Sequence, residues 1–317
     1  MSTINPNSLS CLPADAASNY NYYPNTMINL CVISYQDPTT MAASVSNTLG
    51  LDIVWGPVFP GSDYLKAKSL LFVAVNKKNN EYTVVIRGTS LKSLNAIFKE
   101  DLDIDSTADF NQLTGSATQQ GRLSTGTLNG MNDLLALTSN NQSLIKFLQG
   151  ASIAHLYVTG HSLGGTLTPP MTAYLNYVLY GGSPFKNMAY WSFAGLTSGN
   201  DDFANYFNSL CTPGAPYGRI VNPFDIAPLS FISGGKQTVE NVYAKDDLFI
   251  GILDALIRGS LDILFLEADD KSYIQPLASQ DLMAVFNLNF SDSWTDQVEY
   301  QHHSTTYQGL VQQQYPT

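Results

Sequence analysis

The stretch that decides the fold is AHLYVTGHSLGG, residues 154–165. A short apolar run rich in β-forming residues leads directly into Ser162, which stands between Gly160 and Gly164. The residues that follow, 166–179, are compatible with a helix. This order predicts a strand, a sharp turn that projects the serine side chain beyond the sheet, and a helix. Glycine on both sides lets the strand and the helix pass close to the turn without a Cβ clash.

The same order is that of the nucleophile elbow in the α/β-hydrolase fold. We therefore expect Ser162 to be a nucleophile. We expect the backbone N–H of Leu163, at the start of the helix, to point to where an oxyanion would form. The alternative is a glycine-rich turn with an incidental serine, which would leave the flanking strand and helix unexplained.

The composition describes a globular chain with a large core. Of the 317 residues, 44% are hydrophobic, and no repeat or linker divides the chain, so we expect one α/β domain over residues 1–317. A net charge of −11 argues against a nucleic-acid partner. Only 13% of residues are charged, which favours a secreted protein, yet residues 1–25 form a polar lead-in without a signal peptide. Localisation and oligomeric state stay open. No apolar run is long enough to span a bilayer.

The sequence contains no motif that would bind a metal or an organic cofactor. There is no His-Glu-x-x-His, no Cys-x-x-Cys and no phosphate-binding loop, so we expect neither a metal nor an organic cofactor. Cys11, Cys31 and Cys211 allow one disulfide at most.

Strands and helices alternate along the rest of the sequence, which predicts a mostly parallel sheet with helices on both faces. The expected strands are 70–75 and 82–86, joined as a hairpin, then the run before Ser162, 188–193 and 219–221. The expected helices are 26–49 with a break at Pro38, then 130–148, 166–179 and 202–210. Pro169 and Pro170 fall in the second turn of the helix after Ser162, where we expect a kink or a shortened helix.

A serine needs a base to remove its proton, and the chain has four histidines. His155 lies inside the strand, facing away from the catalytic edge, and His161 is too tightly joined to Ser162 to reach its hydroxyl. The base is therefore His302 or His303.

The acid that orients the base should follow a strand between the serine and the histidine, in the chain order of this fold. Asp225 fits best, because it follows the strand at 219–221 and precedes an apolar segment where an unpaired carboxylate would be costly.

The set of motifs resembles the class 3 lipase family of fungi and bacteria. The matching segments occur in the family's order over roughly residues 65–310: 84–90 with 101–102, 160–165, 192–203, 219–222 with Asp225 and Pro228, and His302 with Tyr307. The resemblance implies Ser162 as nucleophile and Asp225 as acid, with a C-terminal histidine as base. It also implies that Thr89, through its backbone N–H and hydroxyl, and Leu163 form the oxyanion hole. The spacing to Tyr307 favours His302 over His303.

In fungal members the segment after the oxyanion residue is a lid. Residues 90–99 would place four apolar side chains on the underside of such a lid: Leu91, Leu94, Ile97 and Phe98. An ordinary amphipathic helix packed on the core explains them as well. The tryptophan usual in this segment is missing, and Phe98 is the nearest aromatic residue. A second apolar stretch, 246–275, predicts a helical insertion interrupted by charges.

The resemblance implies a serine carboxyl-ester hydrolase, first of all a triacylglycerol lipase acting on a lipid or ester substrate at an oil–water interface. A phospholipase, galactolipase or feruloyl-type esterase would use the same fold and chemistry. A non-enzymatic lipid-binding relative would usually have lost a member of the triad, and none is lost here.

Overall fold

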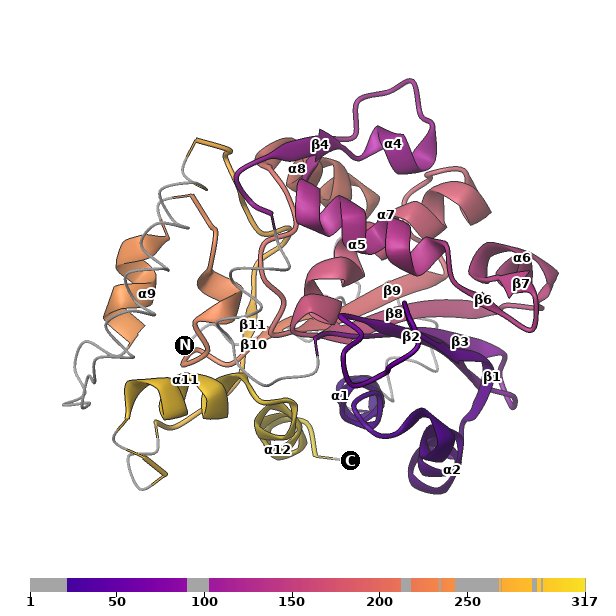
Figure 1. Ribbon diagram of the computed structural model, residues 1–317, viewed down its shortest axis with the longest axis horizontal. Helices are drawn as coiled ribbons and strands as arrows, with labels where there is room; N and C mark the ends of the chain where they lie inside the picture. The colour runs from indigo at the N-terminus through magenta and orange to yellow at the C-terminus, as the bar shows by residue number, and fades with distance from the viewer. Residues whose placement is uncertain are drawn as a thin grey trace.

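The computed structural model describes residues 22–89, 103–211, 218–233, 235–242, 268, 270–286, 290–291 and 293–316. Its centre is a seven-stranded sheet in the order β1-β2-β3-β8-β9-β10-β11 (Figure 1). These strands are β1 (Asp52–Val58), β2 (Leu70–Asn76), β3 (Glu81–Arg87), β8 (His155–His161), β9 (Met188–Phe193), β10 (Gly218–Val221) and β11 (Gln280–Asp281). The predicted hairpin of β2 and β3 is confirmed.

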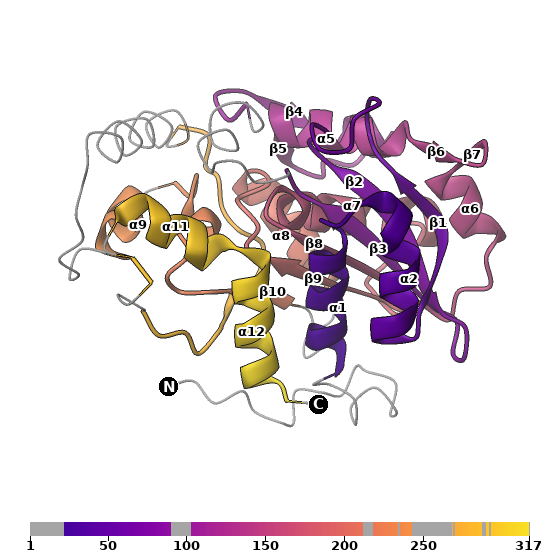
Figure 2. The same ribbon diagram turned by 60° about the horizontal axis from the view of Figure 1, so that its bottom comes forward.

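Helices cover both faces of this sheet, as expected. They are α1 (Tyr22–Ile33), α2 (Pro38–Leu49), α5 (Thr125–Leu135), α6 (Leu144–Gly150), α7 (Leu163–Tyr180), α8 (Asp201–Leu210), α9 (Lys236–Val242), α11 (Trp294–His302) and α12 (Ser304–Gln314). Shorter elements are β4 (Thr107–Asp109), α4 (Asn111–Thr114), β5 (Arg122–Ser124), β6 (Thr138–Ser139), β7 (Gln142–Ser143) and the 3₁₀ turn η3 (Ala227–Leu229). Figure 2 shows α1, α2 and α12 on one face, with α1 and α12 side by side, whereas α5, α7 and α8 lie on the other.

The strand directions bring the site segments together. β1 pairs with β2 and β2 with β3 in antiparallel fashion, and every pair from β3 to β11 is parallel. The register sets Ile86 of β3 opposite Gly160 of β8, so these two strands end at the same edge. Thr89, Ser162 and Asp225 follow the ends of β3, β8 and β10 at this edge, where open α/β sheets place their ligands.

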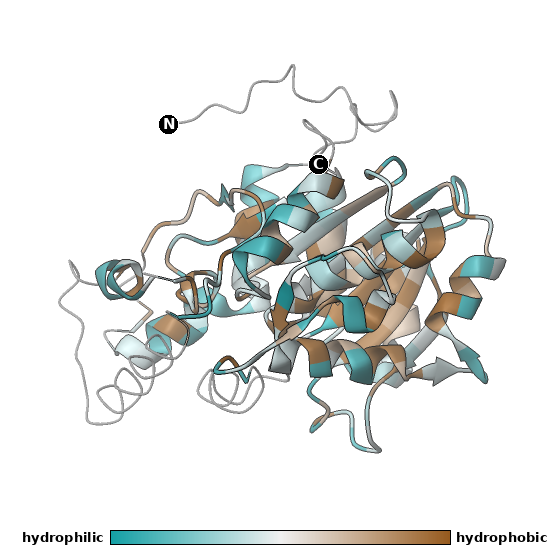
Figure 3. Ribbon diagram, turned by 90° about the horizontal axis from the view of Figure 1, so that it is seen from above, coloured by the Kyte–Doolittle hydropathy of each residue, from teal (hydrophilic) through white to brown (hydrophobic). Residues whose placement is uncertain are grey.

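Hydrophobic residues concentrate on the strands and on the inward sides of the helices (Figure 3). β9 is buried along its whole length, as a central parallel strand covered on both faces should be. One cluster of buried hydrophobic residues includes side chains from both faces of the sheet.

Of the two outcomes expected at Pro169 and Pro170, a kink or a shortened helix, the shortened helix is not found: α7 runs from Leu163 to Tyr180 through both prolines. Each proline lacks the N–H that would bond the carbonyl four residues earlier. Serine hydroxyls supply the missing donors, because Ser192 Oγ donates to the Gly165 carbonyl (2.9 Å) and Ser198 Oγ to the Thr166 carbonyl (2.6 Å). Long-range hydrogen bonds thus replace two helical ones.

Two helix boundaries also differ from the predictions. The helix expected over 130–148 is two helices, α5 and α6, separated by the β6–β7 hairpin. Asn140 and Asn141 form its turn with φ of 50° and 59°, the left-handed conformation that asparagine tolerates. At the start of the chain, α1 begins at Tyr22, so residues 22–25 are helical and not part of a loose lead-in. The break at Pro38 is confirmed: Asp37 caps α2 by accepting a hydrogen bond from Thr39 N.

Several expectations fall outside the described residues. These are the lead-in before residue 22, the candidate lid at 90–99 with Leu91, Leu94, Ile97 and Phe98, and the greater part of the insertion at 246–275.

Candidate active site

The turn at Ser162 has the predicted strained geometry. Ser162 joins β8 to α7 with φ of 60° and ψ of −128°, a backbone conformation that residues other than glycine rarely adopt. The glycines make the turn possible: a Cβ on Gly160 would lie 2.3 Å from the Gly164 oxygen, and a Cβ on Gly164 would lie 2.1 Å from the Ile86 oxygen. The side chain of Ser162 is fully buried.

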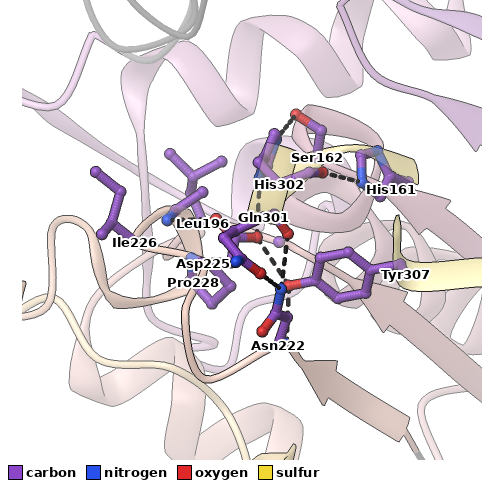
Figure 4. A network of polar contacts seen from close by, with 12 residues as sticks. His161, Ser162, Leu196, Asn222, Asp225, Ile226, Pro228, Gln301, His302 and Tyr307 are labelled. Carbon is purple, nitrogen blue, oxygen red and sulfur yellow. Dashed lines mark hydrogen bonds and ion pairs between the residues drawn. The ribbon is translucent and has the colours of Figure 1, made fainter. Parts of the chain in front are cut away.

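Three of the predicted side chains form one hydrogen-bonded chain (Figure 4). His302 Nε2 lies 2.8 Å from Ser162 Oγ, and His302 Nδ1 lies 2.9 Å from Asp225 Oδ2. A carboxylate only accepts, so Nδ1 carries the proton and the lone pair of Nε2 faces the serine hydroxyl. All three side chains are completely buried.

The second candidate base, His303, does not enter this chain. His303 is exposed, and its Nδ1 accepts hydrogen bonds from Thr305 N (3.3 Å) and Thr305 Oγ1 (2.8 Å). It is the N-cap residue of α12. The two neighbouring histidines therefore differ in their surroundings, one joined to Ser162 and one joined to a helix terminus.

Asp225 is held by two further donors. Its Oδ1 accepts from Ala227 N (2.9 Å) and its Oδ2 accepts from the Tyr307 hydroxyl (2.8 Å). Asn222 N donates to the same hydroxyl at 3.1 Å, which leaves the Tyr307 proton free for the carboxylate. Burial, followed by the charge of Asp225, raises the pKa of Tyr307 well above its ordinary value, so the phenol stays a donor.

Apolar side chains close the other side of the carboxylate. Leu196, Ile226 and Pro228 lie across Asp225 from Tyr307 (Figure 4). Ile226 is completely buried and Leu196 nearly so. Their low polarity strengthens the hydrogen bonds between Asp225 and its partners.

The predicted oxyanion residues come from two adjoining segments. Gly88, just before Thr89, packs so tightly on the elbow that a Cβ on it would lie 2.9 Å from Leu163 N. Leu163 is the first residue of α7, and the first four N–H groups of a helix lack an intrahelical acceptor. Thr89 is half-buried beside this turn. The structure therefore brings the segment of Thr89 against the backbone of Leu163.

Sequence reasoning missed what His161 does. It was excluded as the base for good reason, yet its buried ring reaches the backbone carbonyl of His302. The role of Tyr307 was also missed, although its spacing from His302 entered the choice of base. The contacts of both residues depend on how α11 and α12 dock on the sheet, and no local pattern encodes that docking.

No group of three or more His, Cys, Asp and Glu side chains within the described residues is arranged to hold a metal ion. No helix among the described residues is long and apolar enough to cross a bilayer. Cys31 and Cys211 are free thiols, and burial raises the pKa of each to about 12.

Solved structures of lipases share this fold. The M37 lipase structure matches with a TM-score of 0.71 at 21% identity, covering 88% of this chain and 89% of that one. Nonglycosylated LIP2 lipase of Yarrowia lipolytica matches with a TM-score of 0.50 at 16% identity, covering 68% of this chain and 75% of the other. Lipase II of Rhizopus niveus matches with a TM-score of 0.50 at 19% identity, covering 67% of this chain and 74% of the other. No curated protein sequence matches the chain.

The family model described as Lipase (class 3) matches residues 83–233. That segment contains Thr89, Ser162 and Asp225, and it ends before His302. The resemblance found in the motifs is thereby confirmed, and the sheet order and strained elbow agree with it. Over residues 83–233 the chain therefore matches the class 3 lipase family, and this match supports an enzyme that hydrolyses lipid esters.

Proposed function

We propose that the chain is a serine carboxyl-ester hydrolase that cleaves triacylglycerols through an acyl-enzyme. The observation that supports this most is the continuous buried chain from Ser162 Oγ through the His302 ring to Asp225 Oδ2, with distances of 2.8 and 2.9 Å. Nucleophile, base and orienting acid thus stand in the order that acyl transfer needs.

The first half of the reaction forms the acyl-enzyme. Ser162 Oγ bonds to the ester carbonyl carbon while its proton passes to His302 Nε2, and the carbonyl electron pair moves onto the oxygen. Asp225 stabilises the imidazolium through Nδ1. When the carbonyl reforms, the alcohol leaves with the proton from Nε2.

Water completes the cycle. His302 Nε2 removes a proton from water as its oxygen attacks the acyl carbon, and the proton returns to Ser162 Oγ as the fatty acid leaves. In both halves the oxyanion accepts from the N–H of Leu163 and from the N–H and hydroxyl of Thr89. Each such donor typically contributes about 3 kcal/mol to the transition state.

The substrate class is tested by assaying triacylglycerol emulsions, phospholipid and galactolipid vesicles, and soluble feruloyl and short-chain esters. We expect hydrolysis of the triacylglycerol emulsion that is lost in Ser162→Ala. Ser209→Ala, which removes an exposed serine on α8, is the matched control and should keep full activity. Turnover of phospholipid, galactolipid or feruloyl esters without triacylglycerol would reassign the substrate, and turnover of no ester would contradict the proposal.

A further inference from the structure

His161, the residue directly before the nucleophile, contacts the backbone of the residue proposed as base. Its Nε2 lies 2.9 Å from the carbonyl oxygen of His302, and its Nδ1 lies 3.1 Å from the hydroxyl of Tyr35. The ring is completely buried, and none of these contacts involves Ser162 Oγ.

These partners fix the tautomer of the ring. A carbonyl oxygen can only accept, so Nε2 carries the proton, and Nδ1 accepts the hydroxyl proton of Tyr35. Burial, followed by the neighbouring His302, holds the pKa of His161 well below its ordinary value, so the ring stays neutral. A rotation of the ring would break both hydrogen bonds at once.

The bonded carbonyl belongs to a helix terminus. His302 is the last residue of α11, and the last four carbonyls of a helix have no intrahelical donor. His161 supplies a donor to this carbonyl from the end of β8. The end of α11 is thus joined to the strand that carries the nucleophile.

Aromatic packing surrounds the link. The ring of His161 packs edge-on against Tyr35 at 5.8 Å and against Tyr307 at 5.7 Å between ring centroids. Tyr307 in turn donates to Asp225. One ring therefore contacts the backbone of the base and the side chain that holds the acid.

We propose that His161 is a positioning residue: its Nε2–H fixes the backbone of His302, and so sets the distance and angle between His302 Nε2 and Ser162 Oγ. This inference rests on the proposed roles of Ser162 and His302. Base and nucleophile are 140 residues apart in sequence, so their alignment depends on the docking of α11. A misplacement of about 1 Å can reduce turnover about 100-fold.

Two substitutions separate positioning from simple core packing. His161→Phe keeps an aromatic ring against Tyr35 and Tyr307 and removes both nitrogens. His161→Gln loses the ring, but its amide nitrogen stands the same number of bonds from Cα as the imidazole Nε2, so it still donates to the carbonyl. If the hydrogen bond matters most, the Gln variant is the faster enzyme, and if packing matters most, the Phe variant is.

The experiment measures kcat and KM on a soluble ester, with active sites counted by organophosphate titration. We expect His161→Phe to lower kcat about 10- to 100-fold with KM within about twofold, and His161→Gln to stay within about threefold of the parent. His155→Phe and His155→Gln, at the other end of β8, are matched controls that should leave both constants unchanged. Equal kcat in the two His161 variants, or a faster Phe variant, would overturn the inference.

Two further variants keep the test decisive. If His161→Phe does not fold, His161→Asn replaces it, because the shorter amide reaches toward Tyr35 but not to the His302 carbonyl. It should be as slow as expected for His161→Phe, and parental kcat would overturn the inference. Ser162→Ala tests the proposed function separately: if it stays active, the proposed mechanism fails, whereas an inactive Ser162→Ala beside a fully active His161→Phe removes only the role of His161.

Discussion

The hydroxyl of Tyr307 donates to Asp225 Oδ2 at 2.8 Å, on the same oxygen that accepts from His302 Nδ1. A helix that follows the base therefore holds the acid that orients it. Because Asn222 N donates to one lone pair of the Tyr307 hydroxyl, the hydroxyl proton points to Asp225 Oδ2. The carboxylate is fixed by α12 as well as by its own loop.

Tyr307→Phe tests this contact. It removes one of the three donors to the buried carboxylate and leaves Asn222 N without its acceptor, so we expect a loss of about 1.5–3 kcal/mol in the free energy of unfolding. Turnover should also fall, with KM nearly unchanged, because a less fixed Asp225 orients His302 less well. Urea denaturation and ester kinetics measure the two effects. Parental stability would show that the hydroxyl contributes nothing at this position.

The two adjacent histidines should differ sharply. His302→Ala removes the group between Ser162 and Asp225 and should abolish nearly all turnover. His303→Ala removes only the side chain that caps α12, so it should keep most activity and lose up to about 1 kcal/mol of stability. Kinetics on both variants decide the assignment. An inactive His303→Ala beside an active His302→Ala would reverse it, and two active variants would exclude a histidine base.

Thr89→Val tests the oxyanion hole. The backbone N–H remains and only the hydroxyl is lost, so we expect kcat to fall about 100-fold with little change in KM. The reason is that an oxyanion donor acts mainly in the transition state. A rise in KM at unchanged kcat would instead make Thr89 part of the substrate pocket.

The pH dependence of stability should report on His161. Its pKa is lowered by burial in the folded chain and returns to about 6.5 on unfolding, so the unfolded state binds the extra proton. The contribution of the neutral His161 ring to the free energy of unfolding is therefore complete above pH 6.5. It is lost as the pH falls below 6.5, by up to about 1.4 kcal/mol per pH unit. Urea denaturation from pH 7 to 5 should show a shallower slope for His161→Gln than for the parent. Equal slopes would mean that His161 is protonated in the folded chain.

Local patterns predicted the parts of the fold that depend on local chemistry. The β2–β3 hairpin, the strained turn at Ser162 and the break before α2 each have a signal within a few residues. The Asn140-Asn141 turn also has such a signal, and it interrupts the helix that the sequence predicts over residues 130–148.

Long-range contacts explain what local patterns could not give. Pro169 and Pro170 would end an isolated helix, whereas in α7 the hydroxyls of Ser192 and Ser198 take the place of the two missing backbone donors. Likewise, nothing near His161 in sequence indicates that its ring would meet the carbonyl of His302. The choice between His302 and His303 depended on a family spacing, whereas in the structure it depends on how α11 docks.

The measurement that tests the central claim most directly is labelling with an organophosphate ester, followed by mass spectrometry of the digested protein. We expect one adduct per chain, on Ser162, with activity lost in proportion to labelling. Ser162→Ala should take up no label and lose about 10⁶-fold in kcat while its fold is retained. An adduct on another residue, full labelling with undiminished activity, or a Ser162→Ala variant within tenfold of the parent would contradict the account.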